Sequence, residues 1–448
     1  MAQNGRTSLA FAAVTTLFFA WGFITSMLDP LVASVKGIFT LSDFEAQLSA
    51  FAFFIAYGVM SLPAAVLLTR LTAVPTIKIA LTMMIAGCLT MLFAANAALY
   101  PLVLAGLFIL AGGITCLQVA ANPLAAALGT PERSHFRLTL SQTFNSVGTF
   151  IGPIIGASLF LKDLEVKSGT VVNEAVRSTA LAGIDRAYFW IAGMIAVLLV
   201  FFHLSRRVVA MAAPPADGAM PGRGIKATLA DALSSRWAVF GGLAIFLYVG
   251  AEVAIGTQMA LFLNSDQVWG QSEAAWSFPV IAWLFGNDGV PGISLEEAGK
   301  FTAIYWGSAM IGRAVGSALL ARVNAARLLA VFTVLAASMC LFIMTIGGVS
   351  AGFVALAIGL FNSIMFPVIF TLTLERSTAS QEATSGLLCT AIVGGAFIPL
   401  VSGAVSGATS YAVSFIVPAL CYAALTAFAV MASRSAPQRQ VDATAGGH

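Results

Sequence analysis

Charged residues are scarce in this chain of 448 residues. Asp, Glu, Lys and Arg together make up 9% of it, whereas hydrophobic residues make up 59%. An average soluble domain has about 25% charged residues, so this composition excludes an ordinary soluble protein. The formal net charge of +3 is small and is accounted for by the membrane topology described below, so we expect no nucleic-acid partner.

Cysteine and histidine are also few, and their spacing does not suit a metal site. The five cysteines all lie inside apolar runs and form no CxxC pair. The three histidines, His135, His203 and His448, are far apart in the sequence. Structural metal sites need several such ligands close together, so we expect no bound metal. The cysteines are expected to pack as small apolar residues.

Long apolar runs, in contrast, follow one another along almost the whole chain. A run of about 20 apolar residues is long enough to cross ~30 Å of hydrocarbon as a helix. The sequence therefore predicts an all-α membrane protein with twelve transmembrane helices. The runs lie near residues 9–35, 45–68, 77–96, 101–126, 138–161, 187–205, 237–263, 300–321, 327–346, 350–373, 384–407 and 410–432.

The distribution of basic residues predicts how these helices are oriented. With both termini in the cytoplasm, fifteen of the 22 Lys and Arg residues fall on the cytoplasmic side and six fall outside. Cytoplasmic loops of membrane proteins carry an excess of Lys and Arg. We therefore expect a multi-pass integral membrane protein with both termini in the cytoplasm, and the bacterial cytoplasmic (inner) membrane is the expected location.

A polar segment rich in Pro and Gly, residues 206–236, divides the runs into six plus six. A repeat supports this division. Gln118 lies five residues before Pro123, and Asn362 lies five residues before Pro367. Two six-helix halves are one architecture of transporters, with the substrate near the midplane where the halves meet. The predicted parts are an N-terminal half (1–205), a cytoplasmic linker (206–236) and a C-terminal half (237–448).

Four amides occupy two consecutive predicted helices. Gln118 and Asn122 are four residues apart and share one helix face, and Gln142 and Asn145 are three apart and share another. Amides offer both donors and acceptors, which suits a ligand with many hydroxyl groups. The alternative is that they bond helices to one another, a common use of Asn and Gln inside membranes.

Two carboxylates, Asp29 and Glu252, lie well inside apolar runs, in the first helix of each half. A charged side chain at the centre of a bilayer is costly, and such residues are usually functional. Each could carry a proton or coordinate a sodium ion during a transport cycle. The alternative is a structural acid that pairs with Arg313 or with an amide. Aromatic residues such as Trp21 could stack on a sugar ring, or could simply pack.

Six separated blocks carry a resemblance to a known family. They are "CLQVAANPLAAALG", "FRLTLSQTFNSVGTFIGPIIG", "YVGAEVAIG", "YWGSAMIGRAVGSALL", "GLFNSIMFPVIFTLTLE" and "SGLLCTAIVGGAFIPLVSGAV". Together, and in this order, they resemble the fucose-galactose-glucose-proton symporter family of the major facilitator superfamily. The resemblance extends from about Phe18 to Tyr422.

This resemblance implies a sugar cavity lined by helices 1, 4, 5, 7 and 10. Asp29 matches the helix 1 aspartate that takes part in proton coupling, while Gln142 and Asn145 match the sugar-facing amides of helix 5. Phe366 occupies the aromatic position before the helix 10 proline. Fucose symporters carry a glutamate where this chain has Gln118, and the glutamine is similar to the glucose/galactose branch.

The sequence thus predicts a hexose importer, not an enzyme, that works by symport with a proton or a sodium ion and uses no other cofactor. Coupling is expected at Asp29 and Glu252. The residues expected to bind the sugar are Gln118, Asn122, Gln142, Asn145, Asn362, Phe366 and Trp21. The partners expected are a small-molecule sugar and the lipid bilayer, and a monomer is expected. The alternatives are a drug-proton antiporter and an importer of another sugar, such as fucose or N-acetylglucosamine.

Overall fold

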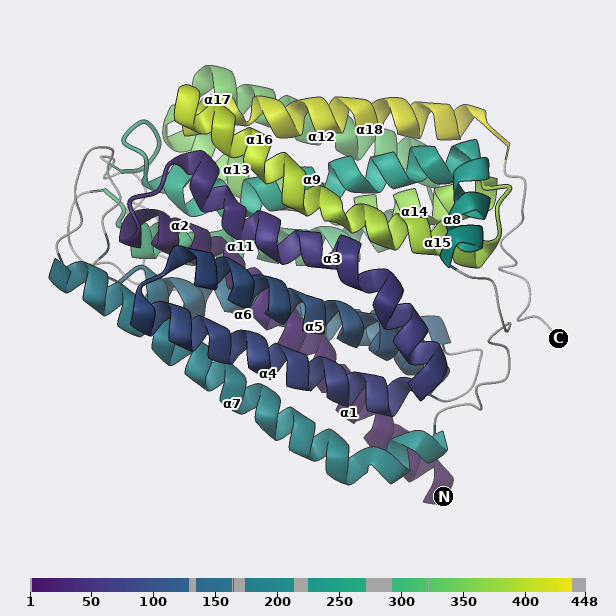
Figure 1. Ribbon diagram of the computed structural model, residues 1–448. Coiled ribbons are helices and arrows are strands. Elements are labelled where there is room, and N and C mark those ends of the chain that lie inside the picture. Colours follow the sequence, from purple (N-terminus) through teal and green to yellow (C-terminus); the bar gives the residue numbers. More distant parts are fainter. Residues whose placement is uncertain are drawn as a thin grey trace.

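The computed structural model is a bundle of helices (Figure 1) and describes residues 2–128, 134–162, 164, 174–212, 225–270, 292–320 and 322–436. All regular structure in these residues is helical, and none of them belongs to a strand. The first group of helices fills the lower part of Figure 1 and consists of α1 (Ala2–Ser26), α2 (Leu28–Ile38), α3 (Asp43–Leu71), α4 (Ala73–Ala97), α5 (Tyr100–Ala127), α6 (Ser134–Phe160) and α7 (Glu174–Ala212).

The second group fills the upper part of the same view, with α11 near the centre. Several of its membrane-spanning segments consist of two or more consecutive helices, such as α13 and α14. The group consists of α8 (Ile225–Ser234), α9 (Arg236–Asn264), α11 (Leu295–Leu320), α12 (Ala325–Ile346), α13 (Gly348–Asn362), α14 (Met365–Arg376), α15 (Gln381–Thr390), η3 (Ala391–Val393), α16 (Gly394–Ala408), α17 (Tyr411–Ser414) and α18 (Ile416–Arg434).

The twelve predicted transmembrane helices are all present among the described residues. Eleven of them are apolar enough to be identified as membrane spans by composition alone. The twelfth, α11, contains Glu296, Glu297, Lys300 and Arg313, which lower its hydropathy. Its 26 residues correspond to roughly 39 Å at 1.5 Å per residue, enough to cross a bilayer.

Two helices extend into segments that the sequence did not predict to be helical. The run predicted at 187–205 is the middle of a helix, α7, that extends from Glu174 to Ala212, because the polar turns at both of its ends continue the helix outside the apolar stretch. The predicted linker is also partly helical, since α8 occupies ten of its residues. The predicted division of the chain into 1–205, 206–236 and 237–448 stays a prediction.

Close helix contacts explain the glycine-rich motifs. A Cβ at Gly148 would lie 2.4 Å from the Phe19 carbonyl oxygen, so α6 packs directly against α1 there. In the second group, a Cβ at Gly394 would lie 1.8 Å from the Phe246 carbonyl oxygen, so α16 packs against α9 in the same way. Small residues let helix backbones approach closely in membranes. The two groups thus repeat one packing arrangement, as the sequence repeat predicts.

Each group also packs against the other through a corresponding pair of helices. Helix α6 contacts α11, and α16 contacts α3. Helix α1 begins and α18 ends toward the same end of the bundle in Figure 1, as an even number of crossings requires. We call this the terminal end, and we call the opposite end, where α2 and α17 lie, the far end.

Candidate functional site

Asp29 lies at a break in the first crossing helix. Pro30 has no backbone N–H and therefore cannot donate to the Ser26 carbonyl one turn earlier, so the helix is interrupted at Met27 between α1 and α2. The Asp29 side chain is buried, with 5% of its residue surface exposed. The break thus places a carboxylate, and freed backbone groups, inside the membrane-spanning region.

The second group of helices encloses this carboxylate. Trp306 Nε1, on α11, donates a hydrogen bond of 2.7 Å to Asp29 Oδ2. Gly256, on α9, lies against the other oxygen, because a Cβ there would be 3.2 Å from Oδ1. Asp29 is therefore held at the contact between the two groups of helices. The hydrogen bond from Trp306 to Asp29 was not predicted from the sequence.

Glu252 lies one helical turn before Gly256 on α9 and is half-buried. Tyr248 Oη donates to Glu252 Oε1 over 2.8 Å. The carboxylate interacts electrostatically with Arg313, and with Asp29 as well. The two carboxylates that the sequence singled out are therefore near enough to influence one another. We call Asp29, Glu252, Trp306 and Tyr248 the carboxylate cluster.

Arg313 joins the two groups on the side of the cluster toward the terminal end. Its Nη1 donates a hydrogen bond of 2.9 Å to Ser146 Oγ on α6. The sequence left open that one of the two buried acids pairs with Arg313. The structure places Arg313 across the contact between the groups, in electrostatic range of Glu252.

Asn362 is the centre of a buried chain of hydrogen bonds in the second group. Tyr422 Oη donates to Asn362 Oδ1 over 2.7 Å, and Asn362 Nδ2 donates to Tyr305 Oη over 2.8 Å. Tyr305 Oη in turn donates to the Glu252 carbonyl oxygen over 3.3 Å. Both ends of the Asn362 amide are therefore occupied by protein. The two tyrosines were not identified from the sequence, where a buried tyrosine looks like any other apolar residue.

The four amides of the first group differ in how much of their bonding capacity the protein uses. Asn145 Nδ2 donates to the Phe18 carbonyl oxygen over 3.0 Å and thereby bonds α6 to α1. Gln118 Nε2 donates to Tyr57 Oη over 3.0 Å. Asn122 Oδ1, in contrast, is buried and accepts no hydrogen bond from the described residues. The half-buried Gln142 side chain likewise has no hydrogen-bond partner among them.

The two predicted aromatic contacts lie in different surroundings. Phe366, on α14, places its ring 6.4 Å from that of Tyr248, next to the carboxylate cluster. Trp21, on α1, is 5% exposed and packs against Phe18, with ring centroids 4.2 Å apart. Among the described residues, no hydrogen bond links Gln118, Asn122 or Gln142 to Asp29. The structure therefore brings the acids and Phe366 together, and it places the amides on neighbouring helices of the first group.

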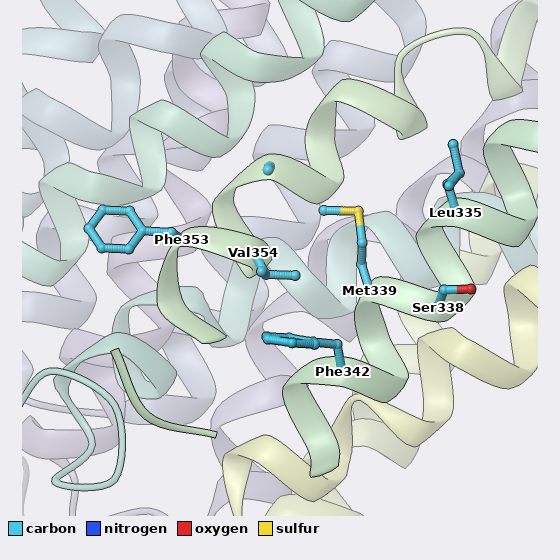
Figure 2. A pocket seen from close by; sticks show the side chains of 7 residues that line it. Leu335, Ser338, Met339, Phe342, Phe353 and Val354 are labelled. Carbon is cyan, nitrogen blue, oxygen red and sulfur yellow. The ribbon is translucent and has the colours of Figure 1, made fainter. Parts of the chain in front are cut away.

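An apolar groove elsewhere on the bundle does not suit a sugar. Figure 2 shows side chains of α12 and α13 that line a groove of about 450 Å³, and Ser338 provides its one side-chain hydroxyl. None of the predicted site residues contributes to it. A ligand with many hydroxyl groups would lose its hydrogen bonds to water there without replacement. The candidate site is therefore the contact between the two groups of helices.

At the far end, polar contacts hold the two groups of helices together. Lys36, on α2, forms an ion pair with Asp43, which begins α3. Tyr411 Oη, from α17 of the second group, donates to Asp43 Oδ1 over 2.7 Å, and Lys36 contacts the same tyrosine. We call these three residues the far-end lock. Deeper in the bundle, Thr257 Oγ1 donates to Gln47 Oε1 over 2.9 Å, and both residues are buried.

Comparisons with known proteins agree with this arrangement. The sequence profile of the Major Facilitator Superfamily matches residues 10–388. A glucose/galactose transporter of Brucella abortus is 36% identical over 427 residues, which cover 95% of this chain and 94% of that protein. The L-fucose-proton symporter of Escherichia coli is 29% identical, and the match covers 97% of this chain and 95% of that protein.

A solved structure supports the same assignment. The crystal structure of the transporter FucP in the outward conformation matches with a TM-score of 0.67 and 28% identity, over 96% of this chain and 100% of that one. The family match, the relatives and the solved structure therefore all indicate the same family. The chain belongs to the Major Facilitator Superfamily, and within it to the family that includes the glucose/galactose transporters and the L-fucose-proton symporters.

Proposed function

We propose that this protein imports a hexose, such as glucose or galactose, by symport with a proton or a sodium ion. Two relatives support the substrate class, since one is named a glucose/galactose transporter and the other an L-fucose-proton symporter. The higher identity to the former, 36% against 29%, favours a glucose-like hexose over fucose. The transport cycle would be alternating access, in which one half rocks against the other.

The amides with spare bonding capacity are the proposed sugar contacts. Among the described residues, Asn122 Oδ1 is a buried acceptor without a partner, and neither end of the Gln142 amide has a hydrogen-bond partner. A buried polar atom without a partner costs roughly 1–3 kcal/mol, which a sugar hydroxyl would recover by donating to it. Gln118 would contribute its carbonyl oxygen, because Tyr57 occupies only its amino group.

Asn145, Asn362, Trp21 and Phe366 stay predicted sugar contacts. In this conformation the amino group of Asn145 and both ends of the Asn362 amide bond to protein. A sugar would reach them only after a rearrangement that releases these bonds. Phe366 needs no such change, since its half-buried ring borders the carboxylate cluster.

The observation that carries the coupling proposal is the position of Asp29. Its carboxylate is buried at the contact between the two groups of helices and is bonded to Trp306 from the opposite group. An ionised carboxylate that loses such a partner inside the membrane is costly. A bound proton or sodium ion would remove that cost when the halves separate. The halves would thus separate only when a cation is bound at Asp29, which couples cation transport to the conformational change.

The cluster and the lock together suggest the state that the molecule occupies. Basic residues favour the cytoplasm for the terminal end. The far-end lock and the Gln47–Thr257 bond hold the two groups of helices together at the opposite end. The conformation would then be inward-facing, with the sugar path closed toward the outside of a bacterial cytoplasmic membrane. A monomer would be sufficient, since each chain contains both halves.

Uptake of radiolabelled sugars into proteoliposomes tests the proposal. Glucose, galactose, fucose and N-acetylglucosamine should be compared under an imposed proton or sodium gradient, for wild type and for Asp29→Asn. We expect accumulation of glucose or galactose in the wild type, and passive exchange without accumulation in the variant. Asp185→Asn is the matched control, because Asp185 lies on α7 and bonds Asn96 away from the site.

Three results would contradict parts of this proposal. Accumulation by Asp29→Asn equal to that of the wild type would remove Asp29 from coupling, and Glu252→Gln would then be the next variant. Wild-type uptake that ignores both gradients would mean a uniporter. No uptake of any of the four sugars would overturn the substrate class.

A further inference from the structure

Helices α4 and α7 pack along one another on the outer surface of the first group. A groove of about 600 Å³ lies between these helices. It is lined by Pro75, Lys78, Ile79, Thr82, Met83 and Ala86 from α4, and by Leu199 and His203 from α7. None of these residues belongs to the candidate sugar site or to the carboxylate cluster.

The side chains that line the groove change from basic and polar at one end to apolar at the other. Lys78 and His203 lie toward the terminal end, whereas Met83, Ala86 and Leu199 lie toward the middle of the membrane. From Lys78 to Ala86 the helix rises by roughly 12 Å, about two turns. The groove therefore begins with basic and polar groups at the depth of lipid headgroups and continues as an apolar channel beside the acyl chains.

More positive charge surrounds the basic end of the groove. Arg206 Nη1 donates to the ring of His203 and also, over 3.3 Å, to its carbonyl oxygen, so the guanidinium is held beside the groove. Arg207 follows it and is exposed. Helix α4 contains no Asp or Glu, and neither does α7 after Asp185. Among the described residues, none of the three cations Lys78, Arg206 and Arg207 forms an ion pair.

We propose that this groove binds an anionic glycerophospholipid, with its phosphate beside Lys78, His203 and Arg206 and an acyl chain along Met83, Ala86 and Leu199. Basic pockets between transmembrane helices are suited to anionic lipid headgroups. The unpaired cations supply the charge complementarity, and the apolar continuation distinguishes a lipid from a soluble phosphate. Because both membrane faces carry headgroups, the inference holds for either orientation of the protein and does not depend on the transported substrate.

Binding of phosphatidylglycerol to the full-length protein in detergent, measured by native mass spectrometry, tests the proposal. Phosphatidylcholine, which has no net charge, is the reference lipid, and glycerol phosphate is the soluble competitor. We expect preferential binding of phosphatidylglycerol and no competition by glycerol phosphate. The variant Lys78→Gln/His203→Gln/Arg206→Gln should bind it about tenfold more weakly or worse, since each basic residue near an anionic lipid surface adds several-fold affinity.

A charge-matched control separates the groove from general surface charge. Arg322, in the connection before α12, and Arg327, in the first turn of α12, are both exposed and line no part of the groove. Arg322→Gln/Arg327→Gln should leave phosphatidylglycerol binding unchanged. Ala86→Phe keeps every charge but fills the apolar part, so it should weaken lipid binding, and it provides the test if the triple variant fails to fold. Equal binding of both lipids, or equal weakening in the triple variant and the control, would overturn the proposal.

Discussion

Two buried amides, Asn122 and Asn362, differ in what the protein gives them to bond. Asn362 is held between two tyrosine hydroxyls, whereas Asn122 Oδ1 has no partner among the described residues. Asn122 lies directly before Pro123 and Asn362 lies five residues before Pro367, and both amides were predicted from the sequence to bind the sugar. In this conformation Asn122 thus has an acceptor available to a ligand, whereas the Asn362 amide is occupied by protein groups.

We expect Asn122→Ala to weaken sugar binding without destabilising the fold. The substitution removes an acceptor that none of the described residues donates to, and one hydrogen bond contributes about 0.5–1.5 kcal/mol net. The Michaelis constant for sugar uptake should therefore rise roughly threefold to tenfold. The melting temperature of the detergent-solubilised protein should stay unchanged. A large loss of thermal stability with unchanged uptake would show that Asn122 is structural.

Asn362→Ala should show the opposite pattern. The substitution leaves the hydroxyls of Tyr305 and Tyr422 without their amide partner inside the second group. Each buried polar group that loses its partner costs about 1–3 kcal/mol. We expect a lower melting temperature in thermal denaturation, and Asn362→Asp, which keeps the acceptor for Tyr422, should recover part of it. Full thermal stability of Asn362→Ala would contradict the assigned network.

At the scale of helices, glycines mark where two elements touch. A Cβ at Gly359 on α13 would lie 2.1 Å from the Tyr305 carbonyl oxygen on α11, whereas a Cβ at Gly193 on α7 would meet nothing within 4 Å. The two glycines look alike in the sequence, since both lie in apolar helices. Their neighbours decide whether an added methyl group is tolerated.

We expect Gly359→Ala to destabilise the protein and Gly193→Ala to leave it unchanged or slightly more stable. The first substitution forces α13 away from α11, and overpacking typically costs 1–3 kcal/mol. The second replaces glycine by a better helix former, worth up to about 1 kcal/mol. Thermal denaturation of both variants in the same detergent checks this. Equal effects of the two substitutions would show that the contact between α11 and α13 is looser than described.

The positions of helices could largely be predicted from the sequence, but contacts between them could not. Apolar runs locate every crossing helix because hydrocarbon thickness dictates their length. The ends of α7 were missed because Glu174, Arg186 and Arg206 are polar yet helical. The Trp306–Asp29 bond joins residues 277 positions apart, and nothing in the periodicity of either helix indicates it. Asp29 itself was identified because an acid inside an apolar run is costly.

At the scale of the whole molecule, the role of the far-end lock can be tested directly by mutation. The lock joins Lys36 and Asp43 of the first group to Tyr411 of the second, at the end where the proposed sugar path would be closed. Hydrogen bonds to charged groups contribute about 1.5–3 kcal/mol each. Because a conformational equilibrium shifts tenfold for every 1.4 kcal/mol, these few contacts are enough to decide which end is open.

We expect Asp43→Asn combined with Tyr411→Phe to open the far end. A cysteine placed at Gln47, which is 1% exposed in the closed state, should then react several-fold faster with a membrane-impermeant maleimide. The background should carry Cys389→Ser, since Cys389 is exposed while the other four cysteines are buried. Asp185→Asn, outside the lock, serves as the control. An unchanged labelling rate in the double variant would show that the lock does not set the equilibrium.

Helix α7 has a further consequence for the membrane that surrounds the protein. Arg186 and Arg206 bracket about 19 uncharged residues, roughly 28 Å of helix, which nearly equals the ~30 Å of a hydrocarbon core. Since charged side chains resist entering hydrocarbon, the helix has little freedom to tilt or slide. The two charged ends of α7 therefore fix the position of the first group of helices along the bilayer normal. In a bilayer of much shorter or longer acyl chains, the apolar length of α7 would no longer match the hydrocarbon thickness, and this difference costs free energy. Transport should therefore be fastest at one membrane thickness.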